Sequence, residues 1–133
     1  MRPISSVLIV DDDPAHLTTY GWVVESAGYR ALLATIGFDG VTLPRDPVDM
    51  VLLDYNLDGR ITAVEVAMMV QSELPNVPVI VLSDAFALPD DIAPFVQGFI
   101  RKGDPAKLVA RLHDLLPLLP DTVLSNSNAE SLP

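Results

Sequence analysis

Five polar residues follow short apolar runs in this sequence, and residues of these types together can bind and accept a phosphoryl group. Asp11 and Asp12 follow the first run, while Asp54, Ser83 and Lys102 follow later ones. Clustered carboxylates resist joint ionisation unless a cation lies among them, and a hard divalent ion such as Mg²⁺ prefers oxygen ligands. A carboxylate beside such an ion and a lysine can attack phosphorus, and a hydroxyl can donate to a phosphoryl oxygen.

Each of these residues also has an ordinary structural explanation when it is taken alone. An aspartate that ends a strand is most often a helix cap or a turn former, and a single serine or lysine there is a turn residue or a surface charge. The joint occurrence of an acid pair, an acid, a hydroxyl and a lysine favours one shared site. We expect Asp13 to cap a helix. His16 and His113 have no second nitrogen ligand nearby in the sequence, so we assign them no chemical role.

Short apolar runs and helical patterns alternate along the chain, and these elements must position the polar set. The runs predict strands buried on both faces, at residues 7–10, 30–35, 48–53, 77–82 and 98–101. Helical patterns occupy residues 14–27, about 62–74 and about 105–116, and in the second of these Val64, Ala67 and Met68 are expected to face the sheet. Residues 37–47 are expected to form a short helix or an irregular crossover. Two prolines within residues 84–96 limit any helix there to a short or broken one.

The alternation of strands and helices predicts a parallel sheet with right-handed crossovers. We therefore expect an α/β fold: a flavodoxin-like, doubly wound, five-stranded parallel sheet of order 2-1-3-4-5 with helices on both faces. In that order the topological switch point lies between the first and third strands. Those strands end at Asp11-Asp12 and at Asp54, which places the carboxylates where such sheets bind ligands.

Length and charge limit the class of protein. The 133 residues suit one domain, and a net charge of −10 disfavours nucleic-acid binding. The absence of cysteine excludes disulfides and thiolate chemistry. No apolar run approaches the roughly 18 residues that would span a bilayer. The first run is also too short for a signal peptide, so we expect a cytoplasmic protein without membrane insertion.

Four separated stretches resemble the receiver domain of bacterial two-component response regulators, in the order typical of that family. They are residues 7–14, 51–57, 81–83 and 99–102, within a similarity that covers about residues 5–116. The resemblance implies that Asp54 is the phosphoacceptor and that Lys102 pairs with the phosphoryl group. It also implies that Ser83 is the switch hydroxyl and that Phe99 is the aromatic residue whose rotamer reports phosphorylation.

The same resemblance implies a cofactor and partners. Mg²⁺ would be bound by Asp12, Asp54 and the backbone carbonyl of Asn56, with Asp11 assisting through water. The phosphoryl donor would be a phosphohistidine on a sensor histidine kinase or a phosphotransfer protein, and a downstream protein would read the switch. Residues 1–118 are expected to form a stand-alone receiver, and residues 119–133 a disordered tail without an output domain.

The chain departs from the family pattern at several positions. Asp58 and Thr62 stand where the family often has Pro and Gly, Asp84 stands where a small residue is usual, and Gly103 replaces a common Pro with a cis peptide. The interval from Ser83 to Lys102 is also a few residues shorter than in the family.

Two alternative functions remain open: a binding module that never takes phosphate, and a hydrolase of the haloacid-dehalogenase type. In such a hydrolase the nucleophile lies on the first strand and a second Asp follows two residues later.

Overall fold

Five parallel strands form the central sheet of the computed structural model, which describes residues 4–37, 40–57 and 61–118. In chain order the strands are β1 (Ser6–Val10), β2 (Arg30–Ala34), β5 (Met50–Asp54), β6 (Val79–Ser83) and β7 (Gly98–Arg101). They are arranged in the order β2-β1-β5-β6-β7, and every neighbouring pair is parallel. The predicted order 2-1-3-4-5 is therefore confirmed.

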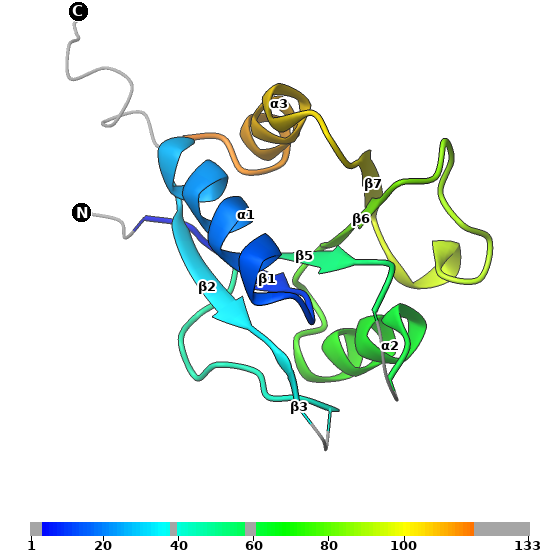
Figure 1. Cartoon of the computed structure of the whole chain (residues 1–133). Helices are drawn as coiled ribbons and strands as arrows, with labels where there is room; N and C mark the ends of the chain where they lie inside the picture. Colours follow the sequence, from blue (N-terminus) through cyan, green and yellow to red (C-terminus); the bar gives the residue numbers. More distant parts are fainter. Residues whose placement is uncertain (1–3, 38–39, 58–60, 119–133) are drawn as a thin grey trace, which may run out of the picture.

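Helices cover both faces of this sheet (Figure 1). The helices α1 (Pro14–Ser26) and α3 (Pro105–Leu115) pack on one face. The helix α2 (Ala63–Glu73) and a single 3₁₀ turn, η1 (Ala93–Phe95), pack on the other. This is the doubly wound α/β architecture that the alternating pattern predicts.

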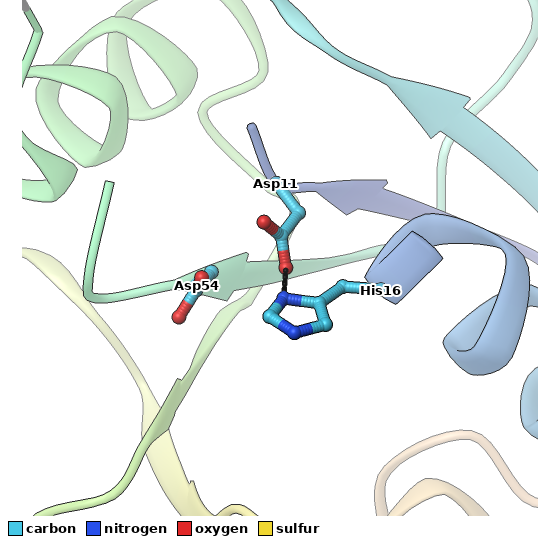
Figure 2. Close-up of side chains that lie close together, drawn as sticks. All are labelled: Asp11, His16 and Asp54. Atoms are coloured by element: carbon cyan, nitrogen blue, oxygen red, sulfur yellow. Dashed lines mark hydrogen bonds and ion pairs between the residues drawn. The ribbon is translucent and has the colours of Figure 1, made fainter. Parts of the chain in front are cut away.

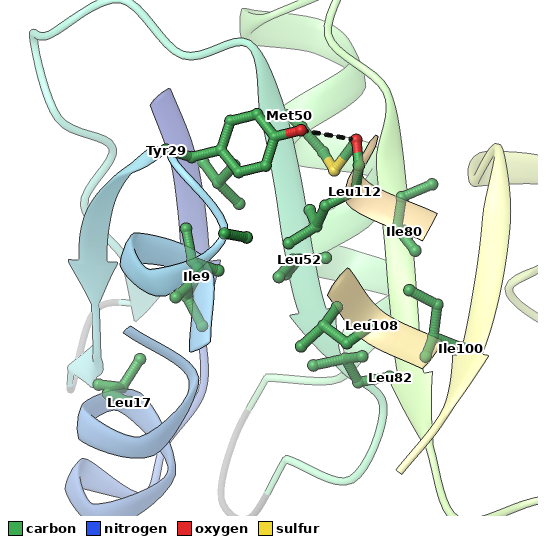
Figure 3. Close-up of a cluster of buried hydrophobic side chains, with 13 residues drawn as sticks. Ile9, Leu17, Tyr29, Met50, Leu52, Ile80, Leu82, Ile100, Leu108 and Leu112 are labelled. Carbon is green, nitrogen blue, oxygen red and sulfur yellow. Dashed lines mark hydrogen bonds between the residues drawn. The ribbon is translucent and has the colours of Figure 1, made fainter. Parts of the chain in front are cut away.

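Strands β1, β5 and β6 are buried along their whole length, because each is covered on both faces. Alternate residues of a strand enter opposite cores: Ile9 packs with α1 and α3, whereas Leu8 packs with α2. Figure 3 shows the first core, in which Leu52 lies close to the α3 residue Leu112. The hydroxyl of Tyr29 donates to the backbone carbonyl of Leu112 at 3.1 Å and ties the start of β2 to α3.

The helix ends follow from local chemistry in the sequence. The Asp13 side chain caps α1 by accepting a hydrogen bond from the backbone N–H of Ala15 at 2.9 Å, and Pro14 occupies the first helical turn. After α1 the chain reverses at Gly28, whose φ of +104° lies in the left-handed region that favours glycine. At its other end, α1 begins only a few residues after β1, so the chain passes directly from the strand end at Asp11 into the helix.

Thr62→Ala is expected to destabilise the fold by about 1 kcal/mol through loss of the α2 cap. The Thr62 hydroxyl accepts from the backbone N–H of Glu65 at 3.2 Å, and the Glu65 carboxylate accepts from the N–H of Thr62 at 2.9 Å. Urea unfolding measures the change. Thr18→Ala is the matched control, because Thr18 is exposed within α1 and its replacement leaves stability unchanged or slightly raised. Equal losses in the two variants would refute the capping role.

Of the two possibilities predicted for residues 37–47, a short helix or an irregular crossover, the structure has the second, since the described residues between β4 (Gly40–Val41) and β5 contain no helix. Strand β4 pairs antiparallel with β3 (Ile36–Gly37), a short pairing that the sequence did not predict. The expectation that Met68 faces the sheet is wrong, because its side chain is 50 % exposed. The buried face of α2 instead follows helical spacing, through Ala63, Val66, Ala67 and Val70.

Residues 84–96 contain only η1, as the two prolines predict. The expected disordered tail at residues 119–133, and the departure at Asp58, lie outside the described residues. In the part of the chain that the structure describes, no helix is both long and apolar enough to cross a membrane.

Candidate functional site

The carboxyl ends of four strands bring the predicted polar residues to one edge of the sheet. Asp11 directly follows β1, Asp54 ends β5, Ser83 ends β6 and Lys102 directly follows β7. The strand register aligns these ends, since the pairs nearest the edge are Val10–Leu53, Asp54–Leu82 and Ser83–Arg101. The expectation that distant positions converge at the switch-point edge is confirmed by this geometry.

An ion pair joins Lys102 and Asp54 at the site. The Lys102 Nζ lies 2.6 Å from Asp54 Oδ1, and the two side chains are only 12 % and 3 % exposed. Burial alone would lower the pKa of Lys102, but the hydrogen bond and the charge of Asp54 outweigh it and hold the pKa above its usual value. The lysine is therefore a permanent cation beside the carboxylate at neutral pH.

Asp11 is the second buried carboxylate of the site, with a side chain only 1 % exposed. Its Oδ1 accepts a hydrogen bond from the backbone N–H of Asp13 at 2.9 Å. Burial raises the pKa of Asp11 to about 6; the Asp13 N–H opposes this rise, while the charge of Asp54 and a hydrogen bond with Asp12 add to it. Ionised Asp11 beside ionised Asp54 is thus an arrangement that a cation would stabilise.

Asp11→Asn is expected to change how stability depends on pH. The pKa of Asp11 is about 6 in the folded protein and near 3.8 ordinarily, so the folded state binds more protons between these values. The stability from this group is fully present below pH 3.8 and is lost as pH rises through 6, a change of roughly 1–3 kcal/mol. Relative to wild type, the variant should therefore gain stability between pH 4 and 7 in urea unfolding experiments.

Asp46→Asn is the control for this experiment, because Asp46 is an exposed carboxylate that pairs with Arg30. Its stability should follow the wild-type pH profile. If the free energy of unfolding of Asp11→Asn also follows the wild-type pH profile, without an increasing gain in stability toward pH 7, then ionisation of the buried Asp11 does not destabilise the folded protein.

A cavity of about 440 Å³ opens at this edge of the sheet. Its lining is dominated by polar and charged side chains: Asp12, Asp13, Pro14, His16, Asp54, Asn56, Asp84 and Lys102. The backbone N–H of Asn56 donates to Asp54 Oδ1 at 3.2 Å, so this one oxygen contacts both Asn56 and Lys102. The predicted metal-binding residues Asp12, Asp54 and Asn56 therefore share one cavity, and Asp84 lies in its lining, as the departure at that position implies.

Ser83 lies at this edge of the sheet, and Phe99 lies on β7. Ser83 is buried at the end of β6, and its hydroxyl accepts a hydrogen bond from the backbone N–H of Ala85 at 3.1 Å. Phe99 is half-buried on β7. Gly103 has a φ of +95°, which the fixed ring of a proline cannot adopt. The described residues contain no cis peptide, in keeping with this departure from the family pattern.

His16 is the residue of this site that reasoning from the sequence missed. Its Nδ1 lies 3.2 Å from Asp11 Oδ2, and Figure 2 shows the ring facing the space between Asp11 and Asp54. One ligand atom from each of these three residues lies within 4.8 Å of the others. The sequence signal was available, because His16 follows the strand-end Asp11 by five residues and lies in the first turn of α1. The other histidine, His113, bonds the carbonyl of Ala27 at 3.0 Å instead.

Comparison with known proteins gives the same family over most of the chain. Residues 7–113 match the family model of the response regulator receiver domain. Transcriptional regulatory protein GlrR of Escherichia coli (strain K12) is 34 % identical over 93 residues, which are 69 % of this chain and 21 % of GlrR. Polar-differentiation response regulator DivK of Brucella ovis is 29 % identical over 96 residues, which are 70 % of this chain and 76 % of DivK. The chain thus spans about a fifth of the length of GlrR.

Solved structures show the same fold. The response regulator TrrA of Thermotoga maritima, in complex with Mg²⁺ and BeF, superposes with a TM-score of 0.70 at 22 % identity, covering 85 % of this chain and all of TrrA. Chemotaxis protein CheY4 of Vibrio cholerae gives a TM-score of 0.72 at 20 % identity, with 86 % of this chain and all of CheY4 covered. The sheet order, the acidic edge and the match over residues 7–113 lead to one conclusion: this chain belongs to the response regulator receiver domain family of two-component signalling.

Proposed function

We propose that this chain is a cytoplasmic receiver that accepts a phosphoryl group on Asp54 from a phosphohistidine of a sensor histidine kinase or phosphotransfer protein. The observation that carries the proposal is the 2.6 Å pair between Asp54 and Lys102, buried at the edge of an open acidic cavity. A carboxylate held beside a permanent cation is placed as a nucleophile toward an anionic phosphoryl donor. The phosphorylated form would signal by protein contacts.

The transfer forms one bond and breaks another. A carboxylate oxygen of Asp54 attacks phosphorus, the P–N bond of the phosphohistidine breaks, and the departing imidazole keeps the bonding electron pair and takes up a proton. Lys102 neutralises charge on the phosphoryl oxygens, and positioning supplies most of the remaining rate. Hydrolysis of the acyl phosphate later returns inorganic phosphate and the free carboxylate. The chain is therefore a phosphoacceptor signalling domain rather than an enzyme acting on a separate substrate.

The donors of the cavity fit a magnesium ion. Asp11, Asp12, Asp54 and the backbone carbonyl of Asn56 are the proposed ligands, and all offer the oxygen atoms that Mg²⁺ prefers. Two of these carboxylates, Asp11 and Asp54, are buried close enough to raise the pKa of Asp11. When bound, Mg²⁺ supplies positive charge that stabilises the phosphoryl oxygens.

Two residues near the site are proposed to transmit the modification. Ser83 would give up its bond to the Ala85 N–H, which is 3.1 Å long, and donate its hydroxyl proton to a phosphoryl oxygen. Phe99, half-buried on β7, would change rotamer as the β6 end moves. The short crossover between β6 and β7, with η1 alone, is the segment adjacent to both residues and is the proposed route of output.

The test is phosphorylation by a small donor. The protein is incubated with acetyl phosphate and Mg²⁺ and its intact mass is measured; we expect a gain of one phosphoryl group that requires Mg²⁺. Because acyl phosphates are labile, binding of beryllofluoride with Mg²⁺ is measured alongside. The change in tryptophan and tyrosine fluorescence reports this binding. Absence of both the mass gain and beryllofluoride binding would sink the proposal and favour a binding module that never takes phosphate.

A further inference from the structure

His16 adds a nitrogen donor to a cavity whose other metal donors are oxygens. The imidazole is 48 % exposed, so an ion in the cavity can reach it, whereas Asp11 beside it is almost fully buried. Asp11, His16 and Asp54 come from the end of β1, the first turn of α1 and the end of β5. Three separate elements thus direct one potential ligand each toward a common point (Figure 2).

The spacing of the ligand atoms fits a single metal ion. Bonds from zinc to nitrogen or oxygen are about 2.0–2.2 Å long, so two adjacent ligand atoms on one ion lie roughly 3.0–3.5 Å apart. The Nδ1 of His16 lies 3.2 Å from Asp11 Oδ2, within that interval. The atom from Asp54 lies within 4.8 Å of both, which a small side-chain movement toward an ion would shorten.

The second nitrogen of the ring faces the carboxylate of Asp13. The Nε2 of His16 lies 3.6 Å from Asp13 Oδ2, and Asp13 is itself held by its capping bond to the backbone N–H of Ala15. Histidine ligands commonly direct their second N–H to such a carboxylate, which leaves the other nitrogen free to bind metal. A metal ion bound at Nδ1 would take the place of the proton that Nδ1 donates to Asp11 Oδ2, and the ring proton would then lie on Nε2, on the side of Asp13.

We propose that His16 is a metal ligand of this cavity, and that it makes the site prefer divalent transition ions that accept imidazole over Mg²⁺. The inference rests on the proposed function only in that both use the cavity around Asp54. Imidazole suits zinc, nickel, copper and iron, whereas Mg²⁺ is bound through carboxylates, carbonyls and water. His16 should therefore contribute to the affinity for a transition ion and contribute little to the affinity for Mg²⁺.

Calorimetric titration of the tag-free full chain with NiCl₂ and with MgCl₂ tests the inference. We expect the wild type to bind Ni²⁺ at least a hundredfold more tightly than Mg²⁺. His16→Gln should weaken Ni²⁺ binding by at least tenfold and change Mg²⁺ binding by less than twofold. His113→Gln is the matched control, because His113 bonds the Ala27 carbonyl away from the cavity, and it should bind both ions as the wild type does.

A second readout detects the nitrogen directly. Pulsed electron paramagnetic resonance of bound Mn²⁺ should show modulation from a directly bonded ¹⁴N in the wild type and none in His16→Gln. Unchanged Ni²⁺ affinity in His16→Gln, or no Ni²⁺ binding by the wild type, overturns the inference. It is also overturned if Asp54→Asn leaves Ni²⁺ affinity intact, since the ion would then lie outside the cavity.

The failure of this inference can be told apart from failure of the proposed function. If the wild type takes no phosphate but its Ni²⁺ binding requires both His16 and Asp54, the metal site stands and the phosphoacceptor role falls. If acetyl phosphate and Mg²⁺ modify the wild type and His16→Gln alike while their Ni²⁺ affinities are equal, the phosphoacceptor role stands and His16 is not a ligand.

Discussion

Asp54→Asn is expected to abolish the mass gain from acetyl phosphate, a loss of at least a hundredfold in the rate of modification. The amide of asparagine lacks the anionic oxygen that attacks phosphorus, and it also removes the charge that Lys102 faces at 2.6 Å. A time course of intact mass with Mg²⁺ present measures the effect. Urea unfolding checks that the variant is folded, because the substitution removes the charge beside buried Asp11 but leaves Lys102 without its partner.

Asp46→Asn is the matched control, as it makes the same chemical change at an exposed carboxylate that pairs with Arg30 at 2.8 Å. It should be modified at the wild-type rate. If Asp54→Asn gains phosphate as fast as this control, another side chain is the acceptor. Asp11 and Asp12 would then be the next candidates, since they are the other carboxylates that end a strand at this edge.

Lys102→Met is expected to lower the free energy of unfolding by about 3 kcal/mol at pH 7, because breaking a buried ion pair leaves the other charge uncompensated. Asp54 is 3 % exposed and would face no other cation in direct ion-pair contact among the described residues. Urea unfolding of wild type and variant at pH 7 measures the effect.

The double variant Asp54→Asn/Lys102→Met separates lost pairing from lost packing. It should be more stable at pH 7 than Lys102→Met alone, because the unpaired carboxylate is gone. Lys107→Met is the control, since Lys107 is exposed on α3 and its replacement should change stability by no more than about 0.5 kcal/mol. A double variant as unstable as Lys102→Met would show that the lysine acts through its packing and not through its charge.

Much of the fold followed from local patterns. The apolar runs at residues 7–10 and 77–82 predicted strands because a parallel strand covered on both faces needs apolar residues throughout. The ends of α1 followed from Asp13, Pro14 and Gly28, whose side chains or backbone freedom act within a few residues. Such effects depend on neighbours in the sequence, so a sequence pattern can predict them.

The less predictable parts depended on contacts between distant segments. The buried face of α2 was misassigned at Met68, because several apolar residues compete on that helix and packing against the sheet selects among them. The short antiparallel pairing of β3 with β4 lies in a segment without a periodic pattern, so no local signal predicted it. His16 was passed over because no second nitrogen ligand lies near it in the sequence, although its spacing of five residues from the strand-end Asp11 was a usable signal.

By itself, the sequence determined the class of fold, the strand order and the set of acidic, hydroxyl and lysine residues at the strand ends, because burial and parallel topology impose both the apolar runs and the common edge. Only the tertiary structure decided which of those residues touch. It pairs Lys102 with Asp54, turns the Ser83 hydroxyl to the backbone N–H of Ala85 and adds His16 to the carboxylates. The physical reason is that side-chain contacts depend on how separate elements pack, and packing is a property of the whole chain.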